Sequence, residues 1–373
     1  MNQPIKKYLL KKSVHQTWSL NSKPDQKKYS FVISIPSYAE DNYIQKTLKS
    51  ISNQNNLLLK KTLIIIVINN KVNDENKIIN SNWKTIEIIK LFKNLNIHYV
   101  DAFSCNNALP TKYAGVGLAR KIGFDIGLNF SNENTIFCSL DADTIISEKY
   151  LQVIYKFYNN KYTSSAVINF KHICSSSKKL NESIKSYEEF IKTTSLNLKK
   201  ANSPYYYHAI GSTITCTALA YASVGGMSKR KATEDFYFLE SLAKYKKVKT
   251  INEILVYPSS RISNRVYLGT GFRMEQASKG FDLRELFFKK QSFLILSKWL
   301  KLGKNSMNLK IDTVLLEANI INENLPNFLN EQKIYLIWEG LQKSSPTTEH
   351  FEKQFHRWFD ALKTIKLLKY FSN

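Results

Sequence analysis

The chain has 373 residues, of which 43% are hydrophobic and 13% aromatic, so it can bury a core and is not a disordered protein. Its formal charge of +24 favours anionic partners such as nucleic acid, anionic lipid or phosphorylated substrates. The lysines are spread along the chain, however, so a compositional bias explains the total charge more simply, and only local basic clusters indicate function.

The cysteines and the apolar runs set expectations about the compartment. The four cysteines lie far apart without a CxxC pair and are expected to be reduced. The first 16 residues are basic and lack the apolar run of a signal peptide. The longest apolar runs, 63–68 and 293–296, are far shorter than the roughly 18 residues of a membrane span. We therefore expect a cytoplasmic protein, soluble or peripheral at the inner membrane face.

Strand-like and helix-like patterns alternate over the first 160 residues. The expected strands are 31–35, 63–68, 97–100 and 135–140, and the expected helices are 44–51, 114–128 and 147–158. Pro36 is expected to end the first strand, and Asp41 or Asn42 to cap the helix that follows. This alternation predicts parallel strands with helices on both faces and a ligand site at the edge where the strands end.

The pattern becomes mixed after residue 164 and almost wholly helical after residue 280. Further strands are expected at 166–170, 214–218 and 251–257, with helices at 182–199 and after Glu234. The prediction is an α/β fold with a mixed sheet flanked by helices. Its parts are a polar leader over 1–29, the α/β domain over 30–275 and a helical C-terminal region over 276–373.

Two carboxylates, Asp141 and Asp143, follow the apolar strand at 135–140. Acidic side chains two residues apart at a strand end can approach one point, and their hard oxygen ligands suit Mg²⁺ or Mn²⁺, which neutralises a diphosphate. A DxD is common by chance, and a loop that caps the next helix is the alternative.

A second acidic pair, Glu234 and Asp235, follows the loop 225–230 (GGMSKR) at the start of an expected helix. A carboxylate beside a loop that shapes a pocket is a candidate general base for a sugar hydroxyl. Acids that complement the helix dipole are the alternative explanation.

Five elements occur together in an order and spacing that resemble family 2 glycosyltransferases. They are the run 31–40 (FVISIPSYAE), the strand ending near Ile68, the run 119–123 (ARKIG), the run 140–143 (LDAD), and Gly225-Gly226 with the acids at 234–235. The resemblance covers roughly 30–257, about two thirds of the chain, and it implies the GT-A fold, a Rossmann-like nucleotide-diphospho-sugar transferase fold.

The resemblance implies roles for particular residues. The loop after the first strand contacts the nucleotide in that family, which corresponds to Pro36, Tyr38 and Glu40. The DxD aspartates hold the metal and the ribose-diphosphate, which corresponds to Asp141 and Asp143. In inverting members the last acid of the ED pair is the catalytic base, which corresponds to Asp235, with Glu234 beside it.

One position departs from the family pattern. Family members usually have an aspartate after the second strand that contacts the base, whereas this chain has Asn69 and Asn70 there, and Asp74 is expected to cap a helix. An amide both donates and accepts, so the base preference does not carry over.

Several basic and histidine side chains are further candidates. Arg261 and Arg265 lie in a glycine-flanked loop, 258–273, that looks like a lid able to clamp phosphate, with surface ion pairs as the alternative. Arg120, and Lys121 beside it, carry the same ambiguity. His172 and His208 are candidates for a third metal ligand or, alternatively, structural residues.

The expected function is transfer of a sugar from a nucleoside diphosphate sugar to a hydroxyl acceptor in surface polysaccharide or glycolipid synthesis, by a hexosyltransferase-like enzyme that uses Mn²⁺ or Mg²⁺. The first hypothesis is a transfer that inverts the anomeric configuration of the sugar, with Asp235 as the base. A retaining transferase on the same fold and a noncatalytic polyanion-binding protein are the rivals, although no nucleic-acid motif occurs and no nucleic acid is expected. The basic, aromatic helix at 282–302 either packs on the protein or touches an anionic membrane, and packing is favoured.

Overall fold

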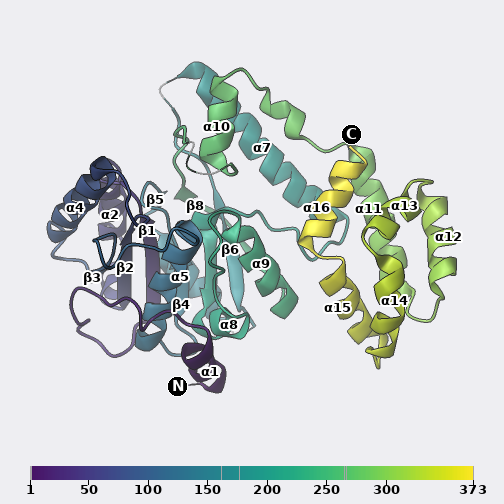
Figure 1. Cartoon of the computed structure of the whole chain (residues 1–373), viewed down its shortest axis with the longest axis horizontal. Coiled ribbons are helices and arrows are strands. Elements are labelled where there is room, and N and C mark those ends of the chain that lie inside the picture. Colours follow the sequence, from purple (N-terminus) through teal and green to yellow (C-terminus); the bar gives the residue numbers. More distant parts are fainter. Residues whose placement is uncertain (1, 161, 176, 264, 266, 373) are drawn as a thin grey trace. The chain divides into compact units, whose positions relative to one another are not determined.

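The structure is a computed structural model that describes the chain except residues 1, 161, 176, 264, 266 and 373 (Figure 1). It divides into two compact units. The first comprises Met1–Lys185 and Ala209–Phe281, and the second comprises Ser186–His208 and Asp282–Asn373. The division falls within the long helix α7 (Lys178–Lys200).

The first unit is built on one sheet with the strand order β3-β2-β1-β4-β7-β6-β8-β5 in the described part of the chain. Neighbours among β1 to β4 run parallel, whereas β7 is antiparallel to both β4 and β6, so the sheet is mixed. The strands are β1 (Phe31–Ser37), β2 (Thr62–Asn69), β3 (Ile97–Ala102), β4 (Ile136–Ser139), β5 (Ile145–Ile146), β6 (Ser165–Phe170), β7 (Ile214–Thr217) and β8 (Lys249–Tyr257).

The first unit also contains helices. They are α1 (Gln3–Lys11), α2 (Ile44–Ser52), α3 (Asn56–Leu59), α4 (Asn76–Lys90), α5 (Val116–Gly127), α6 (Tyr150–Tyr158), α8 (Ala218–Ser223), α9 (Glu234–Tyr245) and α10 (Thr270–Ser278). Helix α5 packs across β1 and β2, and Phe124 of α5 stacks on Phe137 of β4 with ring centroids 5.1 Å apart. Both rings are buried, and burying such a side chain contributes about 1.5–3 kcal/mol. This packing fixes α5, which carries Arg120, against the centre of the sheet.

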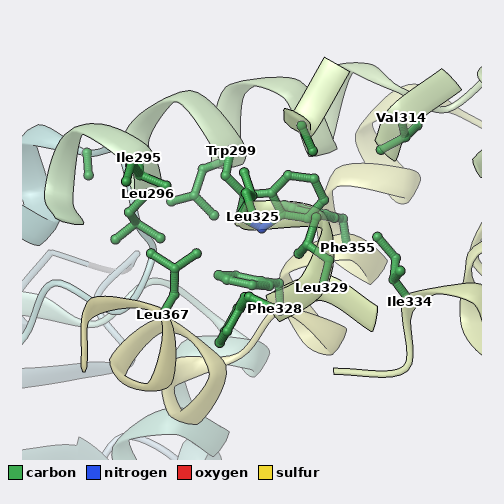
Figure 2. Close-up of a cluster of buried hydrophobic side chains, with 14 of the residues drawn as sticks. Ile295, Leu296, Trp299, Val314, Leu325, Phe328, Leu329, Ile334, Phe355 and Leu367 are labelled. Carbon is green, nitrogen blue, oxygen red and sulfur yellow. The ribbon is translucent and has the colours of Figure 1, made fainter. Parts of the chain in front are cut away.

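The second unit is helical, as expected. Its helices are α11 (Lys290–Asn305), α12 (Ile311–Ile321), α13 (Leu325–Glu331), α14 (Ile334–Lys343), α15 (Thr348–Trp358) and α16 (Ala361–Tyr370). Figure 2 shows their apolar faces meeting around Trp299, Phe328 and Phe355. Trp299 packs edge-on against Phe355 and Phe359, at 5.6 and 5.8 Å between ring centroids. Packing inside the helical unit thus uses the aromatic face of α11.

The predicted fold class, a mixed sheet flanked by helices with a helical C-terminal region, is confirmed. Most expected strands are present within two residues of their predicted bounds. None of the described helices is both long enough and apolar enough to cross a bilayer.

Two local predictions are wrong. Strand β1 continues through Pro36 to Ser37, because only its first four residues pair with β4, while all seven pair with β2. The prolyl nitrogen therefore interrupts no ladder on the β4 side. Helix α2 has Tyr43 at its N-cap with no side-chain cap bond, and Asp41 instead accepts a hydrogen bond from Ser81.

Some elements were not predicted. Helix α4 was missed because its sequence, NKIINSNWKTIEIIK, mixes asparagine and lysine into its apolar positions. Helix α1 lies in the segment expected to be a polar leader, and Figure 1 shows it beside α8. Its Tyr8 hydroxyl donates to the buried Asp125 at 2.6 Å. The contact partner is on α5, so the local sequence of α1 carries no sign of it.

Candidate active site

Loops from three parallel strands meet at one edge of the sheet. Tyr38 and Glu40 follow Pro36 at the end of β1, and Asp141 and Asp143 follow β4. Strand β2 ends at the same edge with Asn69 and Asn70. Because the carboxyl ends of parallel strands share an edge, residues up to 105 positions apart in the sequence gather there.

The buried guanidinium of Arg120 joins the DxD motif to the ED motif. It projects from α5 and forms ion pairs with Asp141 and with Glu234, which is the first residue of α9. Only 3% of Arg120 is exposed, so an unpaired charge there would be very costly. A Cβ atom at Gly211 would lie 2.2 Å from its Nη2, so only glycine leaves room for this geometry.

The carboxylates around Arg120 share its positive charge. Burial lowers the pKa of Arg120, but Asp141, Glu234 and Asp235 reverse this effect and raise it. Burial also raises the pKa values of Glu234 and Asp235, while Arg120 opposes the rise in both. The ED pair therefore holds protons more readily than exposed carboxyls do, which suits groups that exchange protons near neutral pH.

Glu234 and Asp235 lie in different environments. Glu234 is buried and paired with Arg120. Asp235 is partly exposed, and its Oδ1 accepts a hydrogen bond from the N–H of Phe236 at 2.7 Å. The structure thus gives Glu234 a partner inside the protein and leaves Asp235 at the surface of the site.

A second ion-pair cluster connects the lid-like loop to the sheet edge. Arg261 Nε lies 2.8 Å from Asp143 Oδ2, and its Nη2 lies 2.5 Å from Glu40 Oε1, which also accepts a hydrogen bond from Arg265. The Arg261 guanidinium stacks over the Tyr43 ring at 4.2 Å from its centroid. Both loop arginines therefore form ion pairs with residues that are predicted to bind the nucleotide or the metal. Asn264 and Val266 of the same loop lie outside the described residues.

The environment of Asp143 disfavours its charge. Burial raises the pKa of Asp143 to about 6, Arg261 opposes the rise, and the neighbouring charges of Asp141 and Glu40 add to it. Burial and the neighbouring acids thus disfavour the ionised form of Asp143, and an added cation would stabilise that form.

The asparagines after β2 are tied into the protein. The Asn70 amide donates to the carbonyls of Lys71 and Phe103, and its oxygen accepts a hydrogen bond from Asn82 of α4 at 2.9 Å. Asn82 also accepts from the N–H of Ala39, which has a left-handed φ of 52°. Asn69 is buried and directed at neighbouring backbone carbonyls. Both amides therefore support the loops that follow β1 and β2.

Asp74, which the sequence predicts as a helix cap, lies beside Tyr38. It was expected to cap a helix, but Glu75 is the N-cap of α4 and shows no side-chain cap bond. Asp74 lies close enough to Tyr38 to help raise the pKa of that phenol to about 12, after burial as the first cause. Its Oδ2 is buried without a hydrogen-bond partner among the described residues. Such an acceptor beside Tyr38 suits a ligand donor.

The donor set fits a metal bound together with a diphosphate. Among the described residues no three His, Cys, Asp or Glu side chains cluster as ligands. Asp141 and Asp143 supply two hard carboxylates, and Mg²⁺ is commonly held by one or two carboxylates with phosphate oxygens and waters completing its shell. Two histidines were the predicted candidates for a third metal ligand. Nε2 of His172 lies 3.1 Å from the Thr270 hydroxyl oxygen, and His208 belongs to the helical unit.

Comparisons with known proteins find likeness in shape only. No protein-family model matches the chain, and no curated protein matches its sequence. S. aureus TarS 1-349, solved with UDP-GlcNAc, superposes with a TM-score of 0.47 at 13% identity, over 88% of this chain and 89% of that one. The mannosyltransferase PcManGT from Pyrobaculum calidifontis, solved with GDP-Man and Mn²⁺, gives 0.43 at 12% identity, over 95% and 94%.

Replacing Arg120 should reveal how strongly the site depends on it. Arg120→Met leaves Asp141 and Glu234 without their shared counter-ion, and breaking a buried pair costs about 3–5 kcal/mol. Urea unfolding should therefore show a clear loss in the free energy of unfolding. Arg120→Met/Glu234→Gln should recover part of it because the uncompensated buried charge is also removed. An unchanged midpoint in the single variant would contradict the role given to Arg120.

Asp143→Asn should stabilise the free protein in a pH-dependent way. The folded pKa of about 6 exceeds the unfolded value of 3.8, so stability falls as pH rises between them, and above that range the ionised group costs at most about 3 kcal/mol. Thermal unfolding should show a larger gain at pH 7.5 than at pH 4.5. The exposed control Asp312→Asn should show no such difference, and a loss of stability in Asp143→Asn at pH 7.5 would refute the prediction.

Proposed function

We propose that this chain is a metal-dependent glycosyltransferase of the family 2 type, which moves a sugar from a nucleoside diphosphate sugar to a hydroxyl acceptor with inversion. The observation that carries the proposal is the Arg120 bridge between Asp141 and Glu234. Two motifs about 90 residues apart in the sequence thereby form one site. The bridge puts candidate donor and acceptor chemistry side by side, as a direct displacement requires.

The donor would lie along the sheet edge formed by the ends of β1, β2 and β4. Tyr38 and Asp74 lie beside each other there, with the Arg265 guanidinium over the Tyr38 ring at 5.2 Å from its centroid, and both would contact the nucleoside. Arg261 and Arg265, now paired with Glu40, carry the bidentate donors that suit a diphosphate. We propose that binding of the donor exchanges carboxylate partners for phosphate partners at these arginines, with the loop acting as a lid.

Asp141 and Asp143 would hold Mn²⁺ or Mg²⁺ at this edge. When bound there, the metal neutralises the charge that develops on the departing diphosphate. The residues of the chain prepare for this, because Arg120 and Arg261 each orient one aspartate through an ion pair. Preorganised carboxylates reduce the rearrangement that binding requires.

Asp235 would act as the base. Its partial exposure gives an acceptor hydroxyl access, and its raised pKa improves its capacity to take the proton. Glu234 would position it, since the pairing of Glu234 with Arg120 anchors the first turn of α9. The proton passes to an Asp235 oxygen as the hydroxyl oxygen forms the new glycosidic bond and the diphosphate leaves with its bonding pair.

Asp235→Asn should therefore separate chemistry from binding. Turnover, measured as sugar transfer to acceptor or to water, should fall about a hundredfold or more, since positioned proton transfer contributes 10²–10⁴. Affinity for nucleotide and Mn²⁺ should persist, and Glu234→Gln should lose less turnover. Near wild-type turnover in Asp235→Asn, or lost donor affinity with intact turnover, would refute this mechanism.

Asp143→Asn should abolish Mn²⁺-dependent binding of nucleotide, because an amide lacks the charge that a hard cation requires. Isothermal titration of UDP and GDP, with Mn²⁺ and with EDTA, measures the effect in protein shown to be folded by circular dichroism. Asp312→Asn serves as the charge-matched control. Unchanged Mn²⁺-dependent affinity in Asp143→Asn would overturn the metal assignment while leaving the base assignment open to its own test.

A further inference from the structure

Exposed cations surround the loop that leads into the ED pair. Lys229, Arg230 and Lys231 lie in that loop, Lys112 lies in the segment before α5, and Lys12 lies just after α1. All five are exposed, and within the described part of the chain none has a carboxylate partner. This contrasts with Arg120, Arg261 and Arg265, which are all paired with acids.

The fold holds this loop in place. A Cβ atom at Gly117 would lie 2.3 Å from the Arg230 carbonyl oxygen and 2.9 Å from Glu234 Cβ, so the loop crosses the first turn of α5 in close contact. The Arg230 guanidinium stacks on the Tyr237 ring at 3.9 Å, two residues after Asp235. The cationic loop is therefore fixed next to the candidate base.

The Tyr113 ring contacts two of these cations. Lys112 and Lys229 both approach the Tyr113 ring, at 5.3 and 5.7 Å from its centroid, and 37% of Tyr113 is exposed. Helix α5 begins there without a side-chain cap and without an acidic residue in its first turn. Its first turn is buried against the loop, where the Ser228 and Arg230 carbonyl oxygens lie near Gly117.

The N-terminal helix contributes the fifth cation. Asp125 of α5 accepts hydrogen bonds from the Tyr8 hydroxyl at 2.6 Å and from the Val14 N–H at 2.8 Å, so the chain is anchored on both sides of Lys12. A Cβ atom at Gly225 would lie 3.3 Å from the Lys12 Nζ, which places Lys12 beside the segment that leads into the cationic loop. Helix α1 thus extends the surface beyond the loop.

We propose that Lys12, Lys112, Lys229, Arg230 and Lys231 form the acceptor surface, and that the acceptor carries phosphate groups next to the hydroxyl that receives the sugar. This rests on the proposed function, because Asp235 defines where that hydroxyl must lie. Lysines act as point charges toward phosphate, and several of them on one surface suit successive phosphates better than a neutral glycan.

The test compares two triple variants with equal loss of charge. Lys112→Gln/Lys229→Gln/Lys231→Gln alters the acceptor surface, whereas Lys60→Gln/Lys61→Gln/Lys93→Gln alters exposed lysines before β2 and β3, at the opposite edge of the sheet. The probe is fluorescent inorganic polyphosphate, measured by anisotropy over a salt series. The surface variant should bind about tenfold or more weakly with a shallower salt dependence, and the control should change less than twofold.

Further measurements distinguish a lipid phosphate from a free phosphate. They also distinguish failure of the anion site from failure of the proposed function. Vesicles containing phosphatidylglycerol test a lipid headgroup, and loss of that binding in the surface variant would identify this source. Equal losses in both triple variants would overturn the proposal, as would weakened UDP or GDP binding in the surface variant, since the cations would then serve the donor. If no nucleotide binds to any form while polyphosphate binding still depends on the surface, the anion site stands and the proposed function fails.

Discussion

The ion pairs of Arg120 are the interaction on which the site depends. A guanidinium has five donors in a planar fork, so one side chain can satisfy carboxylates from two directions, whereas a lysine ammonium lacks that geometry. Arg120 uses this property to hold Asp141 after β4 and Glu234 at the start of α9. Its own position follows from the packing of α5 across β1 and β2. The hydrophobic centre of the sheet thus determines where the polar chemistry takes place.

The free protein balances its excess acid with its own arginines. Arg120 and Arg261 each occupy one aspartate of the DxD, and Arg261 and Arg265 share Glu40. The compensation is incomplete, since burial and neighbouring acids still raise the pKa of Asp143 to about 6. The ionised Asp143 thus lowers the stability of the free folded protein, as is common at sites that bind a ligand. The cations near Tyr113, by contrast, have no carboxylate partner among the described residues.

Much of the α/β unit could be predicted from the sequence, because buried strands such as 63–68 are uninterrupted apolar runs made mostly of β-branched residues. The resemblance supplied the roles proposed for Glu40, Asp141 and Asp235, which stay predictions. What could not be predicted was pairing: nothing near Arg120 in the sequence indicates Glu234, and nothing in the leader indicates that Tyr8 meets Asp125. Helix α4 was not predicted because asparagine and lysine interrupt its apolar period. The hydrogen bond from Asn82 of this helix to Asn70 was therefore not predicted either.

The most direct test of the account is thermal unfolding of the wild-type chain with a panel of nucleoside diphosphate sugars, each with Mn²⁺ and with EDTA. A ligand that binds only the folded state adds about 2.7 kcal/mol of stability at a hundredfold excess over its Kd. The account predicts that at least one nucleotide sugar raises the midpoint with Mn²⁺ and does so much less with EDTA. A chain stabilised by no nucleotide sugar, or stabilised equally with and without metal, would contradict the account.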